Sequence, residues 1–175
     1  MREEILLKRL YAGDESALEE LIALYYPDIL RYCIWHAPDR NLAEDAVQET
    51  FLKAVKYLGA CRFSGSFKAF LYKIALNTCR DMQKNKWSKH ISLEDGIEEP
   101  GYAEKGFVDA EEALVIRAYV KKQDSLSQEI ILLRFLWNLK LREIAEITGL
   151  PMRTVQSKLR AALKQIKTEL QGGDC

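Results

Sequence analysis

Leu141-Arg-Glu-Ile-Ala-Glu-Ile-Thr-Gly-Leu-Pro-Met-Arg-Thr-Val-Gln-Ser-Lys-Leu-Arg160 is the stretch that decides how the C-terminal part of the chain folds. Its residue types are those that two helices crossing through a tight turn require. Ala145 is small where the helices approach each other, and Gly149 tolerates the positive φ of such a turn. The side chains expected to close a miniature core are Ile144, Leu150, Val155 and Leu159. The run predicts a helix-turn-helix, whose second helix enters a DNA major groove.

The second helix of this motif carries polar side chains that we expect to face away from the miniature core. They are donors suited to phosphates and base edges. The six candidates are Arg153, Thr154, Gln156, Ser157, Lys158 and Arg160. An ordinary surface helix with a solvated basic face is the alternative. We favour DNA binding because the turn glycine, the small alanine and the donor-rich helix occur together.

Outward from the motif, residues 109–171 read as a small helical domain, with a further helix over 127–137 capped by Ser125 or Ser127. Residues 89–108 are acidic and lack helical periodicity, which predicts a flexible linker. Residues 1–88 again show apolar positions at helical spacing, with Asp14 and Asn41 as expected caps. After Asn41, one buried stripe is predicted at Leu42, Ala46, Val47, Phe51, Ala54 and Leu58. No segment alternates with the period of a strand. The predicted fold class is all-α, with two small helical domains joined by the linker.

Composition narrows the class of protein. A chain of 175 residues with 48% hydrophobic content can form real cores, and no run approaches the roughly 18 apolar residues of a membrane span. Acidic residues follow Met1 where a signal peptide would be basic, so we expect a soluble cytoplasmic protein without membrane insertion. The cysteines and histidines show no metal-binding spacing, and no catalytic constellation is apparent. We therefore expect no metal, no cofactor and no enzymatic activity.

Charge is segregated along the chain although its formal net value is zero. Counting Lys and Arg against Asp and Glu, residues 1–61 have 7 against 11 and residues 62–88 have 6 against 1. Residues 89–112 have 2 against 8, and residues 113–175 have 11 against 6. Two basic blocks separated by an acidic one indicate two surfaces that can meet phosphate, with a connector that repels it.

Further motifs extend over nearly the whole chain. They are Gly13-Asp-Glu-Ser-Ala-Leu18, Ala43-Glu-Asp-Ala-Val-Gln-Glu-Thr-Phe-Leu-Lys-Ala54, Phe67-Lys-Ala-Phe-Leu-Tyr-Lys-Ile-Ala-Leu-Asn-Thr-Cys79, Leu132-Leu-Arg-Phe-Leu136 and Glu143-Ile-Ala-Glu146. Together with the helix-turn-helix, the chain resembles bacterial sigma factors of the extracytoplasmic-function type. These factors keep only two sigma domains, called regions two and four. The resemblance implies region two over residues 1–88 and region four over residues 109–171.

The resemblance also implies where the partners bind. The helix over 42–58 would dock on core RNA polymerase, with contacts from Asp45, Gln48, Glu49 and Lys53. The basic block from Arg62 would hold the minus-ten element of promoter DNA, with the loop at 64–66 selecting a base. The minus-ten candidates are Phe63, Ser64, Gly65, Ser66, Lys68, Lys73, Asn77, Arg80 and Lys84. The six donors of the helix-turn-helix would read the minus-thirty-five element.

A surface that melts promoter DNA needs cations for the phosphates and an aromatic platform for an unstacked base. The aromatic candidates are Phe63, Phe67, Tyr72 and Trp87, although packing is the better explanation of Phe67 and Phe70. The expected function is promoter recognition on behalf of core polymerase, with the linker near the RNA exit path and an anti-sigma factor as inhibitor. A dimeric repressor or activator, or an interaction module without DNA binding, are the alternatives.

Overall fold

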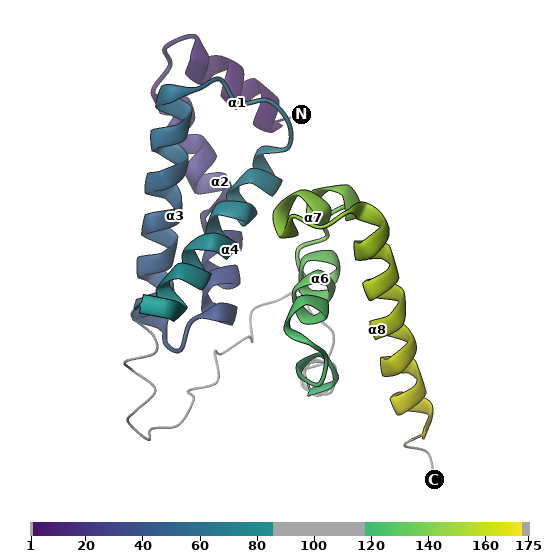
Figure 1. Ribbon diagram of the computed structural model, residues 1–175. Helices are drawn as coiled ribbons and strands as arrows, with labels where there is room; N and C mark the ends of the chain where they lie inside the picture. Colours follow the sequence, from purple (N-terminus) through teal and green to yellow (C-terminus); the bar gives the residue numbers. More distant parts are fainter. Residues whose placement is uncertain (1, 86–117, 173–175) are drawn as a thin grey trace. The chain divides into compact units, whose positions relative to one another are not determined.

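The computed structural model describes residues 2–85 and 118–172, and they fall into two compact helical units (Figure 1). The first unit contains α1 (Arg2–Tyr11), α2 (Ser16–His36), α3 (Arg40–Ala60) and α4 (Phe67–Asn85). The second contains α6 (Ser125–Phe135), α7 (Leu141–Thr148) and α8 (Met152–Gly172). No strand occurs in the described residues, so the predicted all-α fold of two helical domains is confirmed. The linker predicted over 89–108, and the domain ends predicted beside it, lie outside the described residues.

The first unit is held by apolar faces of α2, α3 and α4. Tyr32, Tyr72 and Leu71 are fully buried between these helices, and the rings of Tyr32 and Tyr72 meet edge to face at 5.3 Å. The stripe predicted on α3 is buried at Ala46, Val47, Phe51, Ala54 and Leu58, while its first member, Leu42, is half-buried. Burying a side chain of the size of Val47, Phe51 or Leu58 stabilises the unit by about 1.5–3 kcal/mol. The faces left exposed on α3 and α4 are therefore available to partners.

Helix α3 begins at Arg40, two residues earlier than a cap at Asn41 would allow. Its N-cap is Asp39, whose carboxylate accepts a hydrogen bond from the backbone N–H of Leu42 at 2.9 Å. Asp39 has the extended backbone, φ −144° and ψ 170°, that an N-cap needs, whereas Asn41 already lies in the helix. The prediction of Asn41 as the cap was wrong for this reason. The cap of α6 is likewise Asp124, and neither Ser125 nor Ser127.

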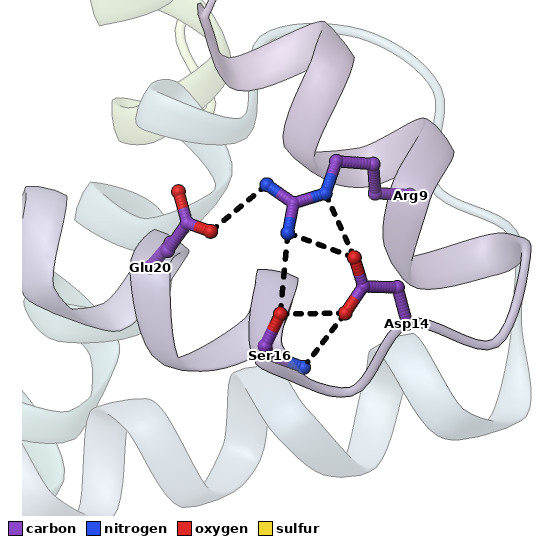
Figure 2. Close-up of polar contacts among 4 residues, drawn as sticks. All are labelled: Arg9, Asp14, Ser16 and Glu20. Atoms are coloured by element: carbon purple, nitrogen blue, oxygen red, sulfur yellow. Dashed lines mark hydrogen bonds and ion pairs between the residues drawn. The ribbon is translucent and has the colours of Figure 1, made fainter.

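A polar network fixes α1 against the start of α2 (Figure 2). The guanidinium of Arg9 donates to the carboxylates of Asp14 and Glu20, both at 2.8 Å, and to the hydroxyl of Ser16 at 3.2 Å. Asp14 also accepts from the backbone N–H of Ser16, the first residue of α2, at 3.1 Å. The N-cap position itself is Glu15, one residue after the Asp14 cap that the sequence predicts. Hydrogen bonds from Ser16 and then from Arg9 hold the pKa of Asp14 below its ordinary value. The network joins the two helices across the turn at Gly13, where φ is +92°.

The second unit has a small core shared by α6, α7 and α8, with Ile130, Leu133, Leu139, Ile144 and Val155 fully buried. Gly149 ends α7 with φ +72°, and its N–H donates to the carbonyl of Ala145 at 2.9 Å. This is the left-handed C-cap that glycine adopts readily. Of the four side chains predicted to close the core, Ile144 and Val155 are buried, while Leu150 and Leu159 are half-buried. The turn and its glycine lie where the sequence predicts them. None of the helices in the described ranges is both long and apolar enough to cross a membrane.

Candidate nucleic-acid interface

The outer face of α8 is polar and basic over most of its length. Arg153, Ser157 and Arg160 are exposed, and Gln156 is half-buried beside them. Their spacing of three and four residues places them on one face, because a helix repeats every 3.6 residues. Lys164 and Lys167 continue the same face and are exposed, although sequence reasoning did not include them. The helix thus carries one continuous row of donors, which we call the α8 row: Arg153, Gln156, Ser157, Arg160, Lys164 and Lys167.

Lys158 does not belong to this row. It lies three residues after the buried Val155 and four before the buried Ala162, so it shares their side of α8. Its Nζ is 3.6 Å from the Oδ1 of Asp124, the cap of α6, and only 35% of its side chain is exposed. The prediction that all six donors face away from the core was therefore wrong for Lys158. Its position is explained by the helical period together with the carboxylate at the start of α6. Thr154 is half-buried one turn before Lys158, so it also lies off the row.

A second basic row lies on α4. Lys73, Asn77, Arg80 and Lys84 are all exposed and are spaced by four, three and four residues. This spacing brings the four side chains onto one face, which we call the α4 row. Lys68 lies five residues before Lys73, which is about 140° around the helix, and it is half-buried. The structure therefore brings together four of the five polar residues predicted on this helix and separates Lys68 from them.

The loop before α4 is open at its centre and held at its ends. Ser64 and Gly65 are exposed, and Gly65 has φ +116°, a conformation that residues other than glycine rarely adopt. Ser66 caps α4, since its hydroxyl accepts from the N–H of Ala69 at 3.2 Å. Phe63 is half-buried, with its ring 4.9 Å from that of Phe70. The loop therefore offers two small exposed residues next to an aromatic cluster.

Two aromatic candidates do not reach the surface. Tyr72 is 0% exposed and Phe67 is 3% exposed, so neither ring offers a face to a base. Burial raises the pKa of the Tyr72 hydroxyl above its ordinary range. The prediction of Tyr72 as a stacking platform was wrong, because its helical position faces the core of the unit. For Phe67 the packing explanation favoured from the sequence is confirmed. Tyr57 was missed: it is 43% exposed and packs on Phe70 at 4.9 Å. Trp87 lies outside the described residues.

A third surface lies on α3. Asp45 and Gln48 are exposed, and Glu49 is half-buried. Leu52 lies on the same face, four residues beyond Gln48, and is 55% exposed, which sequence reasoning did not notice. Lys53 is engaged within the unit, because its Nζ is 3.2 Å from the Oγ1 of Thr78 on α4 and 3.6 Å from the Oε1 of Glu49. We call Asp45, Gln48, Glu49 and Leu52 the α3 face, an exposed leucine surrounded by polar acceptors.

Comparison with known proteins identifies the family of this chain. A family model for sigma-70 region 2 matches residues 21–89, and one for sigma-70 region 4 matches residues 125–166. The RNA polymerase sigma factor SigV of Bacillus subtilis is 30% identical over 160 residues, which cover 91% of this chain and 95% of the relative. The chain belongs to the extracytoplasmic-function (ECF) family of RNA polymerase sigma factors. The ECF sigma-E factor of Escherichia coli K12 is 29% identical over 183 residues, covering 98% of this sigma factor and 95% of the relative.

Solved structures share the fold of this sigma factor. CnrH, solved in complex with the cytosolic domain of CnrY, has a TM-score of 0.70 at 21% identity, with 100% of both chains covered. RpoE of Bartonella quintana, solved with the anti-sigma factor NepR, has a TM-score of 0.66 at 22% identity, covering 87% of this chain and 96% of that one. As a sigma factor, the protein is a transcription initiation factor that directs RNA polymerase to promoters, and it is not an enzyme.

Within the sigma factor, the matched regions contain the surfaces described above. The region 2 match covers most of α2 and all of α3 and α4, so it includes the α3 face, the loop and the α4 row. The region 4 match covers α6, α7 and most of α8. Helix α1 lies outside both matches. The described residues contain no group of three or more His, Cys, Asp or Glu side chains placed to hold a metal ion.

Proposed function

We propose that this sigma factor uses three surfaces in initiation: the α3 face for core polymerase, the loop with the α4 row for the minus-ten element, and the α8 row for the minus-thirty-five element. The observation that carries the proposal is the alignment of Lys73, Asn77, Arg80 and Lys84 on one exposed face of α4, directly after the open loop. A row of cations beside a loop of small residues suits a strand whose phosphates are tracked while one base is held apart. The residue assignments predicted from the sequence are kept except where the geometry separates them.

Docking on core polymerase is assigned to the α3 face. The exposed side chain of Leu52 can bury apolar area against a partner, and the acidic and amide groups around it provide specificity. Lys53 is assigned a supporting role, because its ammonium already bonds Thr78 and pairs with Glu49. We expect Leu52→Asp to lose core binding by at least tenfold. Ile5→Asp is the matched control, since Ile5 is 56% exposed in the same unit but on α1.

Single-strand binding is assigned to the loop and the α4 row. Arg80→Ala with Lys84→Ala removes two cations from the row, so the affinity of the holoenzyme for a non-template minus-ten oligonucleotide should fall and its salt dependence should weaken. Lys68→Ala is the matched control, because Lys68 has the same charge on the same helix but lies off the row. Equal losses in both proteins would remove the α4 row from the proposal.

Regulation by an anti-sigma factor is part of the proposal. CnrH and the Bartonella quintana RpoE were each solved bound to a partner, and NepR is an anti-sigma factor by name. We propose that a comparable protein holds this sigma factor inactive in the cytoplasm, that residues 1–88 and 109–171 act as the two functional domains, and that residues 89–108 pass near the RNA exit path of the polymerase.

Run-off transcription with core polymerase is the decisive experiment. Core enzyme with this sigma factor should initiate at a promoter selected from the genome of the source bacterium, and core enzyme alone should not. A chain that binds duplex promoter DNA tightly without core enzyme, and adds nothing to transcription when core enzyme is present, would be a repressor or activator instead. Absence of any binding to core enzyme would end the proposal.

A further inference from the structure

Helix α1 contacts both ends of the loop that precedes α4. The backbone N–H of Phe63 donates to the hydroxyl oxygen of Tyr11 at 2.6 Å, and the backbone N–H of Phe67 donates to the Oε1 of Glu3 at 2.8 Å. The guanidinium of Arg62 also lies 5.7 Å from the centre of the Tyr11 ring. Figure 1 shows the segment between α3 and α4 running beside α1. The two bonded amides bracket residues 64–66, the part of the loop assigned to base selection.

These two hydrogen bonds restrict the conformation of the loop more than its own sequence does. Between the bonded amides the backbone passes through Gly65 at φ +116°, and the Ser66 hydroxyl caps α4 by accepting from the N–H of Ala69. A short irregular segment with a glycine at its centre has many conformations, and fixing its ends removes most of them. Both bonds are partly buried, so water competes with them less than at an exposed site.

The position of α1 is itself fixed, so it can serve as a reference for the loop. Leu6 and Leu7 are buried at 2% and 8% exposure, and they account for ordinary packing of α1 on the unit. Glu3 also accepts a hydrogen bond from the Tyr25 hydroxyl of α2. At its other end, α1 is tied to α2 by the network around Arg9. The polar contacts of Glu3 and Tyr11 with the loop are additional to this packing.

We propose that α1 is a positioning element for minus-ten recognition, in which Glu3 and Tyr11 hold residues 64–66 in the conformation that receives an unpaired base. The inference rests on the proposed function of the loop. Neither residue touches DNA in this scheme. Both act through the backbone of the loop, so that the cost of ordering it is met before the base arrives, which raises affinity and selectivity. Helix α1 precedes the segment matched by the region 2 model, so Glu3 and Tyr11 lie outside that segment.

The test uses full-length protein in holoenzyme and two variants that remove one acceptor each. Tyr11→Phe keeps the ring over which Arg62 lies but removes the oxygen that accepts from Phe63. Glu3→Ala removes the acceptor for Phe67, and Glu3→Gln restores an oxygen at the same place. Glu4→Ala is the matched control, because Glu4 is an exposed acid on the same helix. Each holoenzyme is titrated with a non-template minus-ten oligonucleotide and with versions changed at single bases.

We expect Tyr11→Phe and Glu3→Ala each to lower oligonucleotide affinity about three- to tenfold, the effect of one net hydrogen bond, and to flatten the preference among bases. Glu3→Gln should recover most of the loss, and Glu4→Ala should behave as wild type. Core binding should stay within about twofold. Amide hydrogen exchange in the free protein should accelerate at Phe63 in Tyr11→Phe and at Phe67 in Glu3→Ala.

Wild-type affinity and base preference in both acceptor variants would overturn the inference, as would an equal loss in Glu4→Ala. A loss of affinity that is the same for every base, without a change in preference, would reduce α1 to a structural role and also overturn it. If wild-type holoenzyme does not bind the oligonucleotide at all, the proposed function of the loop fails instead. Unchanged exchange at Phe63 and Phe67 would then overturn the positioning contacts on their own.

Discussion

Arg160 and Lys158 carry the same charge two residues apart on α8, but their surroundings differ. Arg160 is exposed within the α8 row, whereas the Lys158 ammonium lies 3.6 Å from the Asp124 carboxylate. We expect Arg160→Gln to weaken binding of the minus-thirty-five element in a salt-dependent way. Lys158→Gln should leave the salt dependence of binding unchanged. The contrast between the two variants tests the α8 row directly, because the two residues have the same charge and neighbouring positions in the sequence and differ only in their surroundings in the structure.

The size of the contrast follows from counterion release. Each phosphate contact contributes about 0.9 to the slope of log K against log salt on duplex DNA. If Arg160 makes one such contact, wild-type affinity should fall about 3.5-fold more than that of Arg160→Gln between about 50 and 200 mM salt. Losing the Lys158 pair should cost at most about 1 kcal/mol of unfolding free energy, because 35% and 57% of the two side chains are exposed.

Fluorescence anisotropy of labelled promoter duplex with holoenzyme, measured at four salt concentrations, gives the slopes. Thermal denaturation of the free protein gives the stability of each variant. Equal slopes for wild type and Arg160→Gln would remove Arg160 from the interface. A slope for Lys158→Gln that falls as far as expected for Arg160→Gln would show that the pair with Asp124 opens on DNA. The structural role assigned to Lys158 would then be wrong.

Three other expectations concern the region 2 unit. Gly65→Ala should lower the melting temperature and promoter opening, since φ +116° costs a residue with a Cβ about 1–3 kcal/mol, while Gly59→Ala, without positive φ, should not. Asp14→Asn should be less stable than wild type at neutral pH, and thermal melts should show the gap closing as pH falls through the depressed pKa of Asp14, below 3.8. Cys61 is exposed, whereas contact with Cys79 and burial raise the pKa of the Cys33 thiol. A thiol reagent should therefore modify Cys61 in the folded protein and Cys33 only after unfolding. Rapid labelling of Cys33 in the folded protein would contradict this expectation.

Helical periodicity correctly predicted features that depend on residues within about two turns of the same helix. It placed Val47, Phe51 and Leu58 on the buried side of α3 and Gly149 at the turn of the helix-turn-helix. The same helical period also separates Lys68 from Lys73 and Lys158 from Arg160. Those two errors arose because the residues were grouped by their charge and not by their positions around the helix. Tyr72 was misjudged because a tyrosine is compatible with either a core or a surface, and only packing against Tyr32 decides between them.

Caps and loop contacts were beyond the sequence pattern for a different reason. Asp39 and Asn41 are both acceptable caps, and the choice depends on which residue adopts the extended backbone. The partners of the loop are more distant, since Glu3 and Phe67 are 64 residues apart and Tyr11 and Phe63 are 52 apart. No periodicity links residues at such separations. A glutamate and a tyrosine on an amphipathic helix look like ordinary surface residues until the fold brings the loop beside them.

The contacts of Glu3 and Tyr11 with the loop bear on how sigma factors are compared. If residues 64–66 take their conformation from Glu3 and Tyr11, the loop sequence alone does not determine which base it accepts. Two members with the same loop but different residues at the positions of Glu3 and Tyr11 would then hold it differently and prefer different bases. Conversely, moving the loop of this chain into another member should transfer its preference only when α1 is moved with it. Minus-ten specificity would therefore be a property of α1 and the loop together.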